Sequence, residues 1–328
     1  MRAVTTLLSR IWPLLLAMGL LLPSSMLAPR HALAHRSRTP ARLRVAHPIR
    51  VAVTIDDLPG GGPEIGGFTH PRIVADIIAA LRAHGVRNAT GFVVGSMLEG
   101  HPERRAALDS WVEAGFEVGN HTYSHVSLAE VGLDAYLKDV EANQPLISEL
   151  EKRTGQRAHY FRCPYLEEGN TEADRRALLR FLSAHGYKLA RVSIDFDDWA
   201  WADAYNRCMQ QNDTQALQAL SQTYLDNGKA WLAWAVAAAR EVLGHPITQV
   251  LLLHANAATA QNLDALLSAY DRMGVRFVPL SEALASEVYS ASYEFGGANV
   301  LAQASHRLGR PLPPWLAQPM PLIDVLCR

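Results

Sequence analysis

The sequence predicts an α/β protein built on a parallel sheet, and two regularities support this prediction. Short apolar, β-branched runs alternate with helix-like stretches from residue 49 to about residue 285. Alternation of this kind favours parallel strands joined by right-handed helical crossovers. The second regularity is the number of expected strands, seven, which fits a closed or nearly closed barrel better than a long open sheet. A doubly wound open sheet remains the alternative.

The expected strands are the runs rich in Val, Ile, Leu and Phe. They cover residues 49–55, 89–94, 116–119, 159–161, 189–194, 250–253 and 276–279. The expected helices cover residues 71–84, 102–114, 133–153, 171–185 and 259–273. A glycine stands just past each of these helices, as a stop signal would, at Gly85, Gly115, Gly155, Gly186 and Gly274.

The interval between the fifth and sixth expected strands breaks this rhythm. It carries two helical patterns, at residues 214–225 and 229–243, where one helix is expected. We therefore predict a helical insertion at about residues 200–247, before the sixth strand. Residues 291–328 follow the barrel as a C-terminal extension. The glycines at 60–62 follow a pair of carboxylates and precede a proline, which predicts a flexible loop and not a dinucleotide cradle.

The first residues are typical of an export signal. Arginines stand at positions 2 and 10, an apolar stretch covers residues 11–27, and a small-residue cleavage pattern follows at 32–34. We interpret residues 1–34 as a signal peptide, 35–48 as a linker and 49–290 as the folded domain. An uncleaved membrane anchor is the rival interpretation of the apolar stretch, and no other segment is long and apolar enough to span a bilayer. The protein is therefore expected to be exported, to the periplasm or beyond the cell.

Composition restricts the class of protein further. Apolar residues make up 49% and charged residues 19%, which allows a sizeable core. The net charge of -1 argues against nucleic acid as the partner, because phosphate binding requires a positive excess. The three cysteines, Cys163, Cys208 and Cys327, leave at least one thiol unpaired in a monomer, and the sequence does not say which two could form a disulfide.

Polar clusters follow five of the expected strands. In α/β barrels the chemistry lies at the carboxyl ends of the strands, so these clusters are expected to meet on one face. They are Thr54-Ile55-Asp56-Asp57, Asn120-His121-Thr122-Tyr123-Ser124-His125, Arg162-Cys163-Pro164-Tyr165, Asp195-Phe196-Asp197-Asp198-Trp199 and, for the sixth strand, His254.

The spacing of two histidines in the second cluster indicates a metal site. His121 and His125 are four residues apart, which would place both imidazoles on one side of a helical turn. Asp56 or Asp57 could complete a three-ligand site with open positions for water. Two carboxylates directly after a buried strand are costly unless they are paired or bind a cation, and the one that does not bind could act as a base.

Three more residues have a chemical interpretation from their surroundings. Arg162 could hold a nearby carboxylate in its ionised form. His254 ends a very apolar run, and a neighbouring charge on Asp198 would raise its pKa so that it could serve as a general acid.

These five clusters, in this order, resemble the signature of the polysaccharide deacetylases, carbohydrate esterase family four, whose shared unit is the NodB homology domain. The resemblance covers roughly residues 49–285, and it departs from the usual pattern at Ile55, where an aromatic is more common, and at Cys163, where a second proline is common. It implies a distorted (β/α)7 barrel, here with a helical insertion before the sixth strand, and the hydrolysis of N-acetyl or O-acetyl groups on a sugar polymer.

The resemblance also implies a role for each site residue. Asp57, His121 and His125 would bind a divalent metal, usually zinc and sometimes cobalt or another ion. Asp56 would be the general base and Arg162 would orient it.

On the other side of the substrate, His254 would be the general acid, tuned by Asp198. The Tyr165 backbone N–H would stabilise the oxyanion, and Trp199 would line the acetyl pocket. Trp231 and Trp234 of the insertion are expected to be core contacts in preference to sugar-stacking groups.

Two other functions remain as alternatives. One is a related metal amidohydrolase acting on a small cyclic amide. The other is a catalytically silent envelope protein that binds glycans, although the base, the ligands and the acid are all present in the sequence. The sequence does not choose between peptidoglycan, chitin-like oligomers and acetylated exopolysaccharide as substrate.

Overall fold

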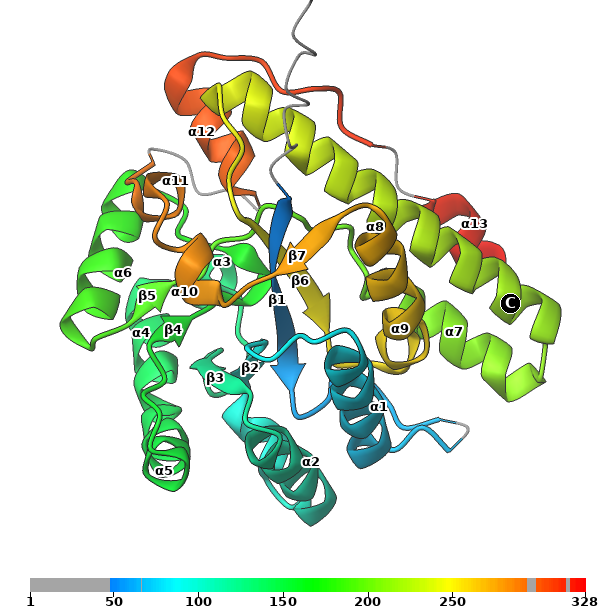
Figure 1. The fold of residues 1–328 in the computed structure, drawn as a ribbon. Coiled ribbons are helices and arrows are strands. Elements are labelled where there is room, and N and C mark those ends of the chain that lie inside the picture. The colour runs from blue at the N-terminus through cyan, green and yellow to red at the C-terminus, as the bar shows by residue number, and fades with distance from the viewer. Residues whose placement is uncertain (1–47, 66, 294–298, 317–318) are drawn as a thin grey trace, which may run out of the picture. The chain divides into compact units, whose positions relative to one another are not determined.

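The computed structural model describes residues 48–65, 67–293, 299–316 and 319–328, which contain a sheet of seven parallel strands surrounded by helices (Figure 1). The predicted signal peptide and most of the predicted linker lie outside the described residues. The strand order is β5-β4-β3-β2-β1-β6, and β7 pairs with the first residues of β1. The strands are β1 (Ile49–Leu58), β2 (Thr90–Val93), β3 (Glu117–Asn120), β4 (Tyr160–Phe161), β5 (Lys188–Leu189), β6 (Gln249–His254) and β7 (Val275–Phe277).

The sheet curls back on itself through the segment that follows β5. Ile194 forms a parallel bridge with Leu251 of β6, and the Leu252 N–H donates to the Ile194 carbonyl. The segment 188–194 therefore contacts β4 at its start and β6 at its end, which gives the distorted barrel that the sequence predicts. Of the predicted strand 189–194, only Leu189 lies in a regular strand and Ile194 in an isolated bridge. Ser193 and Ile194 both donate to the Val250 carbonyl, which is not a regular ladder pattern.

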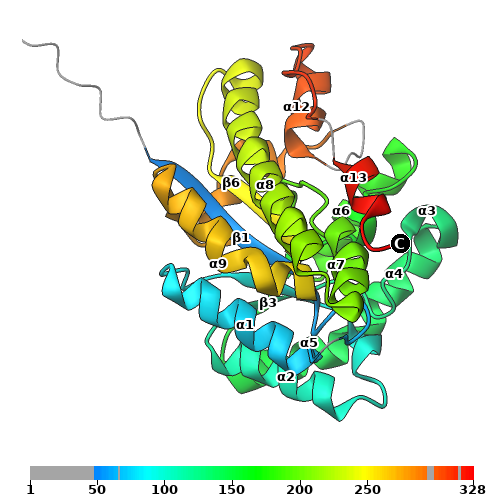
Figure 2. The same cartoon turned by 90° about the vertical axis from the view of Figure 1, so that its right-hand side faces the viewer.

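The helices pack around this sheet, and α1 lies between α2 and α9 in both views (Figures 1 and 2). Local signals fix their starts: Thr69 caps α1, Thr171 and Asp174 form a capping box on α6, and Asn256 caps α9. The helices of the barrel are α1 (His70–Ala83), α2 (Pro102–Glu113), α3 (Leu128–Val131), α4 (Leu133–Ala142), α5 (Gln144–Thr154), α6 (Glu172–Ala184), α9 (Ala257–Arg272), α10 (Leu280–Ala283) and α11 (Glu287–Ser290), with 3₁₀ turns at Gly95–Leu98 and Pro164–Leu166.

One predicted helix is in fact two. The stretch 133–153 is divided at Asn143 into α4 and α5. The Asn143 side chain is buried and donates to the Val93 carbonyl at 2.8 Å and to Asn120 at 3.0 Å, and Pro145 is the second residue of the next helix. A buried side chain that supports two strand ends therefore interrupts the helical pattern.

In the insertion, by contrast, two predicted helices are one. The two predicted helices at 214–225 and 229–243 form one long helix, α8 (Thr214–Leu243), and an unpredicted helix, α7 (Ala200–Gln211), precedes it. Asn227 and Gly228 lie between the two predicted helices, but in the structure they continue the helix because they pack on the core. Asn227 donates to the Phe196 carbonyl, and a Cβ at Gly228 would lie 2.7 Å from Leu266.

The C-terminal residues are joined to the insertion. Cys208 of α7 forms a disulfide with Cys327, and Arg207 donates to the carbonyls of Ile323 and Leu326. The two helices of this region are α12 (Val300–Leu308) and α13 (Met320–Val325). Trp231 and Trp234 are buried as core contacts, as expected. Within the described part of the chain, every helix is too short or too polar to cross a bilayer.

Candidate active site

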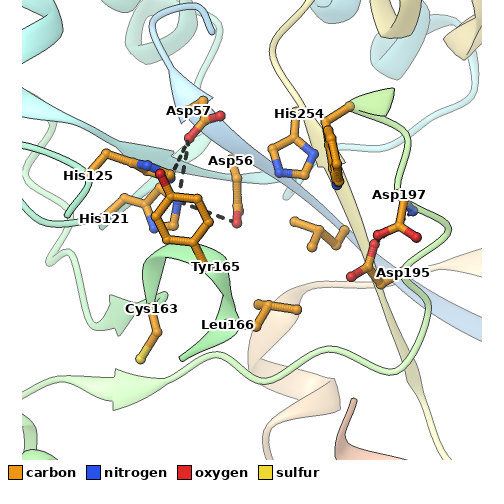
Figure 3. A pocket seen from close by; sticks show the side chains of 12 residues that line it. Asp56, Asp57, His121, His125, Cys163, Tyr165, Leu166, Asp195, Asp197 and His254 are labelled. Atoms are coloured by element: carbon orange, nitrogen blue, oxygen red, sulfur yellow. Dashed lines mark hydrogen bonds and ion pairs between the residues drawn. The ribbon is translucent and has the colours of Figure 1, made fainter. Parts of the chain in front are cut away.

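The ends of β1, β3 and β6 and the loops after β4 and β5 open into one cavity of about 420 Å³ (Figure 3). The structure thus brings the five polar clusters together, although they are far apart in the sequence. The lining residues are Asp56, Asp57, His121, His125, Cys163, Tyr165, Leu166, Asp195, Asp197, Trp199, Leu252 and His254.

Asp57, His121 and His125 form a cluster that fits a metal ion. One ligand atom from each lies within 4.8 Å of the others. The Asp57 Oδ1 atom is 3.2 Å from His125 Nε2 and 3.6 Å from His121 Nε2, as the dashed lines of Figure 3 mark. This oxygen is buried and has no well-aligned hydrogen-bond donor among the described residues. A buried carboxylate oxygen facing two imidazole nitrogens without a donor is the arrangement that a divalent cation satisfies.

The protonation of His121 and Asp57 suits this role. The His121 Nδ1 atom lies 2.8 Å from the Arg162 carbonyl, so Nδ1–H donates there and the Nε2 lone pair faces Asp57. Burial lowers the pKa of His121, which keeps the ring neutral. Burial alone would raise the pKa of Asp57, but its close contact with His125 and the positive charge of His254 lower it overall, so the carboxylate is ionised.

The route by which the two histidines meet differs from the prediction. Residues 121–125 form a loop and no helical turn, and Thr122 and His125 take left-handed backbone angles with φ of 63° and 54°. The rings still meet, with centroids 5.0 Å apart. The two histidines that the four-residue spacing singled out therefore lie together, but a left-handed loop and no helical turn brings them there.

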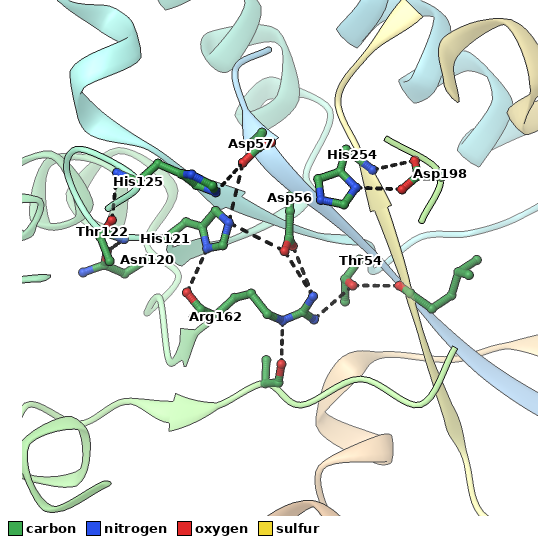
Figure 4. A network of polar contacts seen from close by, with 12 residues as sticks. Thr54, Asp56, Asp57, Asn120, His121, Thr122, His125, Arg162, Asp198 and His254 are labelled. Atoms are coloured by element: carbon green, nitrogen blue, oxygen red, sulfur yellow. Dashed lines mark hydrogen bonds and ion pairs between the residues drawn. The ribbon is translucent and has the colours of Figure 1, made fainter. Parts of the chain in front are cut away.

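Asp56 is buried beside the cluster and is bound by Arg162 (Figure 4). The Arg162 Nη1 atom donates to both carboxylate oxygens, at 3.2 and 3.3 Å, Nη2 donates to Thr54 at 3.1 Å, and Nε donates to the Ala190 carbonyl at 2.5 Å. The guanidinium also lies over the Phe92 ring. Arg162 is thus a buried, fully oriented group that holds the Asp56 carboxylate in place through charge-assisted hydrogen bonds.

His254 faces Asp56 from the opposite side of the cavity and is held by Asp198 (Figure 4). The Nδ1–H of His254 donates to Asp198 Oδ1 at 2.6 Å, and the His254 backbone N–H donates to Oδ2 at 2.9 Å. Thr259 donates to the same carboxylate at 2.7 Å. Burial lowers the pKa of His254, but the charge and hydrogen bond of Asp198 outweigh burial and raise it to about 10. His254 is therefore a proton donor at neutral pH.

Tyr165 and Trp199 lie at the edge of the cavity, and both side chains are largely exposed. Tyr165 has a left-handed φ of 56°, and no acceptor for its N–H is found among the described residues. Asp57, Leu166 and Asp197 also take positive φ. Left-handed non-glycine residues typically cost about 1–3 kcal/mol each, so strain of this kind is concentrated around the cavity.

Sequence reasoning gave no role to several residues that line the cavity. Asp195 and Asp197 belong to a predicted cluster, and burial together with the charge of Asp197 raises the pKa of Asp195 to about 6. The close spacing of Asp195, Asp197 and Asp198 after a strand is the sequence signal that could have indicated a role for them. Cys163 is buried and unpaired, and burial raises the pKa of its thiol, which makes it an unreactive part of the wall.

Comparison with known proteins agrees with these observations. The model of the family described as polysaccharide deacetylase matches residues 44–190. Over this stretch, somewhat less than half of its length, the chain resembles the polysaccharide deacetylases, whose shared unit is the NodB homology domain. The match ends before Asp195, so Asp198, Trp199 and His254 lie outside it.

Two curated relatives show the same likeness. The chain is 28% identical over 156 residues to a peptidoglycan-N-acetylglucosamine deacetylase of Bacillus cereus, covering 47% of this chain and 48% of that protein. It is 29% identical over 149 residues to a peptidoglycan-N-acetylmuramic acid deacetylase of Bacillus subtilis, covering 45% and 26%. The chain thus spans about half or less of the length of these two relatives.

Among solved structures, a mutant of a pseudoenzyme of carbohydrate esterase family four is similar in fold. Its TM-score is 0.50 and its identity is 18%, over 73% of this chain and 68% of that chain. This likeness concerns the fold and agrees with the distorted barrel.

Proposed function

We propose that this protein is a metal-dependent deacetylase that hydrolyses N-acetyl, or O-acetyl, groups on an envelope or extracellular polysaccharide and releases acetate. One observation carries the proposal. The cluster of Asp57, His121 and His125 could hold a metal ion. It shares one cavity with Asp56, a candidate base that Arg162 holds, and with His254, a candidate acid that Asp198 holds.

The residues present fit zinc, with cobalt or another divalent ion as a substitute, because two imidazole nitrogens and one carboxylate leave positions open for water and substrate. A cation held there would act as a Lewis acid on the acetyl carbonyl and would lower the pKa of a water molecule. Asp56, held by Arg162, accepts a proton from the water molecule whose oxygen attacks the carbonyl carbon.

The remaining steps belong to the other side of the cavity. The Tyr165 N–H donates to the oxygen that becomes negative in the tetrahedral intermediate, a contact typically worth about 3 kcal/mol. His254 gives its proton to the nitrogen or oxygen of the sugar as the bond to the acetyl carbon breaks. Asp198 holds the imidazolium in place throughout. Acetate and the free amine or hydroxyl of the sugar are the products.

The open cavity with exposed Tyr165 and Trp199 at its edge supports a polymeric substrate in preference to a small cyclic amide. Two further observations support an exported protein. The relatives are named as peptidoglycan deacetylases, and the Cys208–Cys327 disulfide favours an oxidising compartment.

Acetate release from peptidoglycan, chitin oligosaccharides and acetylated xylan by the purified protein tests the proposal. Zinc-loaded, chelator-treated and Asp56→Asn samples are compared. We expect metal-dependent release that Asp56→Asn abolishes. No release from any polymer by zinc-loaded protein would favour the small-amide or the silent glycan-binding alternative.

A further inference from the structure

The loop between β1 and α1 follows the metal ligand Asp57 directly, and its glycines are fixed by hydrogen bonds. The Gly60 N–H donates to the Asp57 carbonyl at 2.8 Å, and the Gly61 N–H donates to the Ala255 carbonyl at 3.0 Å. Ala255 follows His254, and its own N–H donates to the Asp56 carbonyl at 3.0 Å. The loop that the sequence predicted to be flexible therefore joins the side of the cavity that carries Asp57 (the ligand side) to the side that carries His254 (the acid side).

His70, the first residue of α1, packs against this loop. Its ring is buried, with Nε2 3.1 Å from the Gly62 carbonyl and Nδ1 2.9 Å from Glu64 Oε1. The His70 backbone N–H donates to the same Glu64 oxygen at 2.7 Å. A Cβ at Gly60 would lie 2.2 Å from the His70 ring, so the ring contacts the loop backbone so closely that only glycine fits.

The position of the Asp57 carboxylate depends on the same loop. Asp57 has a left-handed φ of 62°, which persists only where neighbouring contacts impose it. A Cβ at Gly61 would lie 3.2 Å from Asp57 Oδ2, so the backbone of the loop is one wall of the space that the carboxylate occupies. A shift of the loop by a few tenths of an ångström would move the carboxylate relative to His121 and His125.

We propose that His70 and the Gly60–Gly62 loop form a clamp that holds the Asp57 carboxylate in place for metal binding. The same clamp fixes the position of this carboxylate relative to His254. This inference rests on the proposed function in one respect, the binding of a divalent cation by Asp57, His121 and His125. His70 is a positioning residue, since it touches neither the ligand atoms nor the cavity.

Metal affinity tests the clamp. Zinc binding is measured by competition with a chromophoric chelator, and the visible absorption of the cobalt-loaded protein reports the ligand geometry. We expect His70→Ala to bind zinc about 10- to 100-fold more weakly, the range found when a partner of a metal ligand is removed. His70→Gln keeps a donor for the Gly62 carbonyl and should bind within about threefold of the original protein. Gly61→Ala should weaken binding and shift the cobalt spectrum.

His84→Ala is the matched control. His84 lies beyond the last residue of α1, and its ring contacts Asp264 at 3.1 Å and Asp271 at 2.6 Å on α9. Its removal costs the same helix comparable contacts, so it should lower thermal stability and leave zinc affinity and the cobalt spectrum unchanged. Zinc affinity and a cobalt spectrum for His70→Ala and Gly61→Ala equal to those of His84→Ala would overturn the clamp.

Acetate release, recorded on the same samples, separates this inference from the proposed function. A protein that binds zinc but releases no acetate contradicts the deacetylase proposal, while the affinity comparison still decides the clamp. A protein that binds no zinc overturns both.

Discussion

The two sides of the cavity are built differently. On the ligand side, Asp56 and Asp57 lie near the end of β1. The other three residues come from the loops that follow β3 and β4, namely His121, His125 and Arg162. They lie within the stretch that matches the family model, and Arg162 links them by touching Asp56 with its guanidinium and His121 with its carbonyl.

On the acid side, Asp195, Asp197, Asp198 and Trp199 lead directly into the helical insertion and, with His254, lie outside the matched stretch. Here Asp198 holds the His254 imidazolium, and burial together with the charge of Asp197 raises the pKa of Asp195 to about 6. The ligand side therefore lies wholly within the stretch that matches the family model, whereas the acid side is joined directly to the helical insertion.

The largest effect is expected from two substitutions that distinguish the proposed base, Asp56, from the proposed metal ligand, Asp57. Asp57→Ala removes a ligand and should abolish both zinc binding and acetate release. Asp56→Asn keeps the shape of the side chain and should lower kcat by about 10²- to 10⁴-fold, the usual range for a general base, with zinc affinity within about tenfold. Competition titration and acetate release on both variants check this. Loss of zinc by Asp56→Asn, with retention by Asp57→Ala, would reverse the two assignments.

The next effect concerns the acid. His254 has its pKa raised from 6.5 to about 10, so its protonated form is favoured in the folded protein. The stability from this pair is fully present below about pH 6.5 and is lost as pH rises through about 10. Asp198→Asn removes the charge that raises the pKa, so His254 should lose its proton at a lower pH.

Proton NMR of His254 in the metal-free protein and the pH profile of kcat in the zinc-loaded protein measure this shift. The alkaline limb of kcat should move to lower pH in Asp198→Asn. Asp203→Asn, a substitution in the first turn of α7, is the control and should leave the limb in place. An unchanged limb in Asp198→Asn would contradict the assignment of His254 as the acid.

The sequence predicted the ligand side better than the acid side, and the reason is physical. Asp56 and Asp57 lie near the end of β1 and His121 directly follows β3, so the strand ends alone account for their positions. His125 was found by a spacing rule although a left-handed loop, and no helix, brings it in. The clamp of His70 on Gly60 could not be predicted, because it depends on the approach of a helix start to a loop. In the insertion, helix periodicity could not show that Asn227 and Gly228 would be buried against Phe196 and Leu266.

Removing the Cys208–Cys327 disulfide is expected to loosen the insertion beside the acid side and to leave the ligand side unchanged. Cys208 and Cys327 are 119 residues apart, and a bridge closing a loop of that length is expected to contribute about 2–4 kcal/mol to the free energy of unfolding. The double variant Cys208→Ser, Cys327→Ser should lose that stability in urea unfolding. It should also raise KM more than it changes zinc affinity, because α7 follows Trp199. Cys163→Ala, which removes the unpaired thiol, controls for the loss of sulfur. Equal losses in KM and in zinc affinity would show that the two sides are coupled.

The smallest effect is expected at Asp195. Its pKa of about 6 means that the carboxylate is ionised at pH 7 and largely protonated at pH 5. An ionised carboxylate in the wall accepts hydrogen bonds from sugar hydroxyls, so KM should rise about 3- to 10-fold between pH 7 and pH 5, the equivalent of one hydrogen bond of about 1 kcal/mol. Asp195→Asn should show the raised KM throughout this range, with zinc affinity unchanged. A KM that stays constant with pH in the original protein and equals that of Asp195→Asn would mean that this carboxylate does not touch the substrate, and the specificity of the acid side would then have to lie in Trp199 and Asp197.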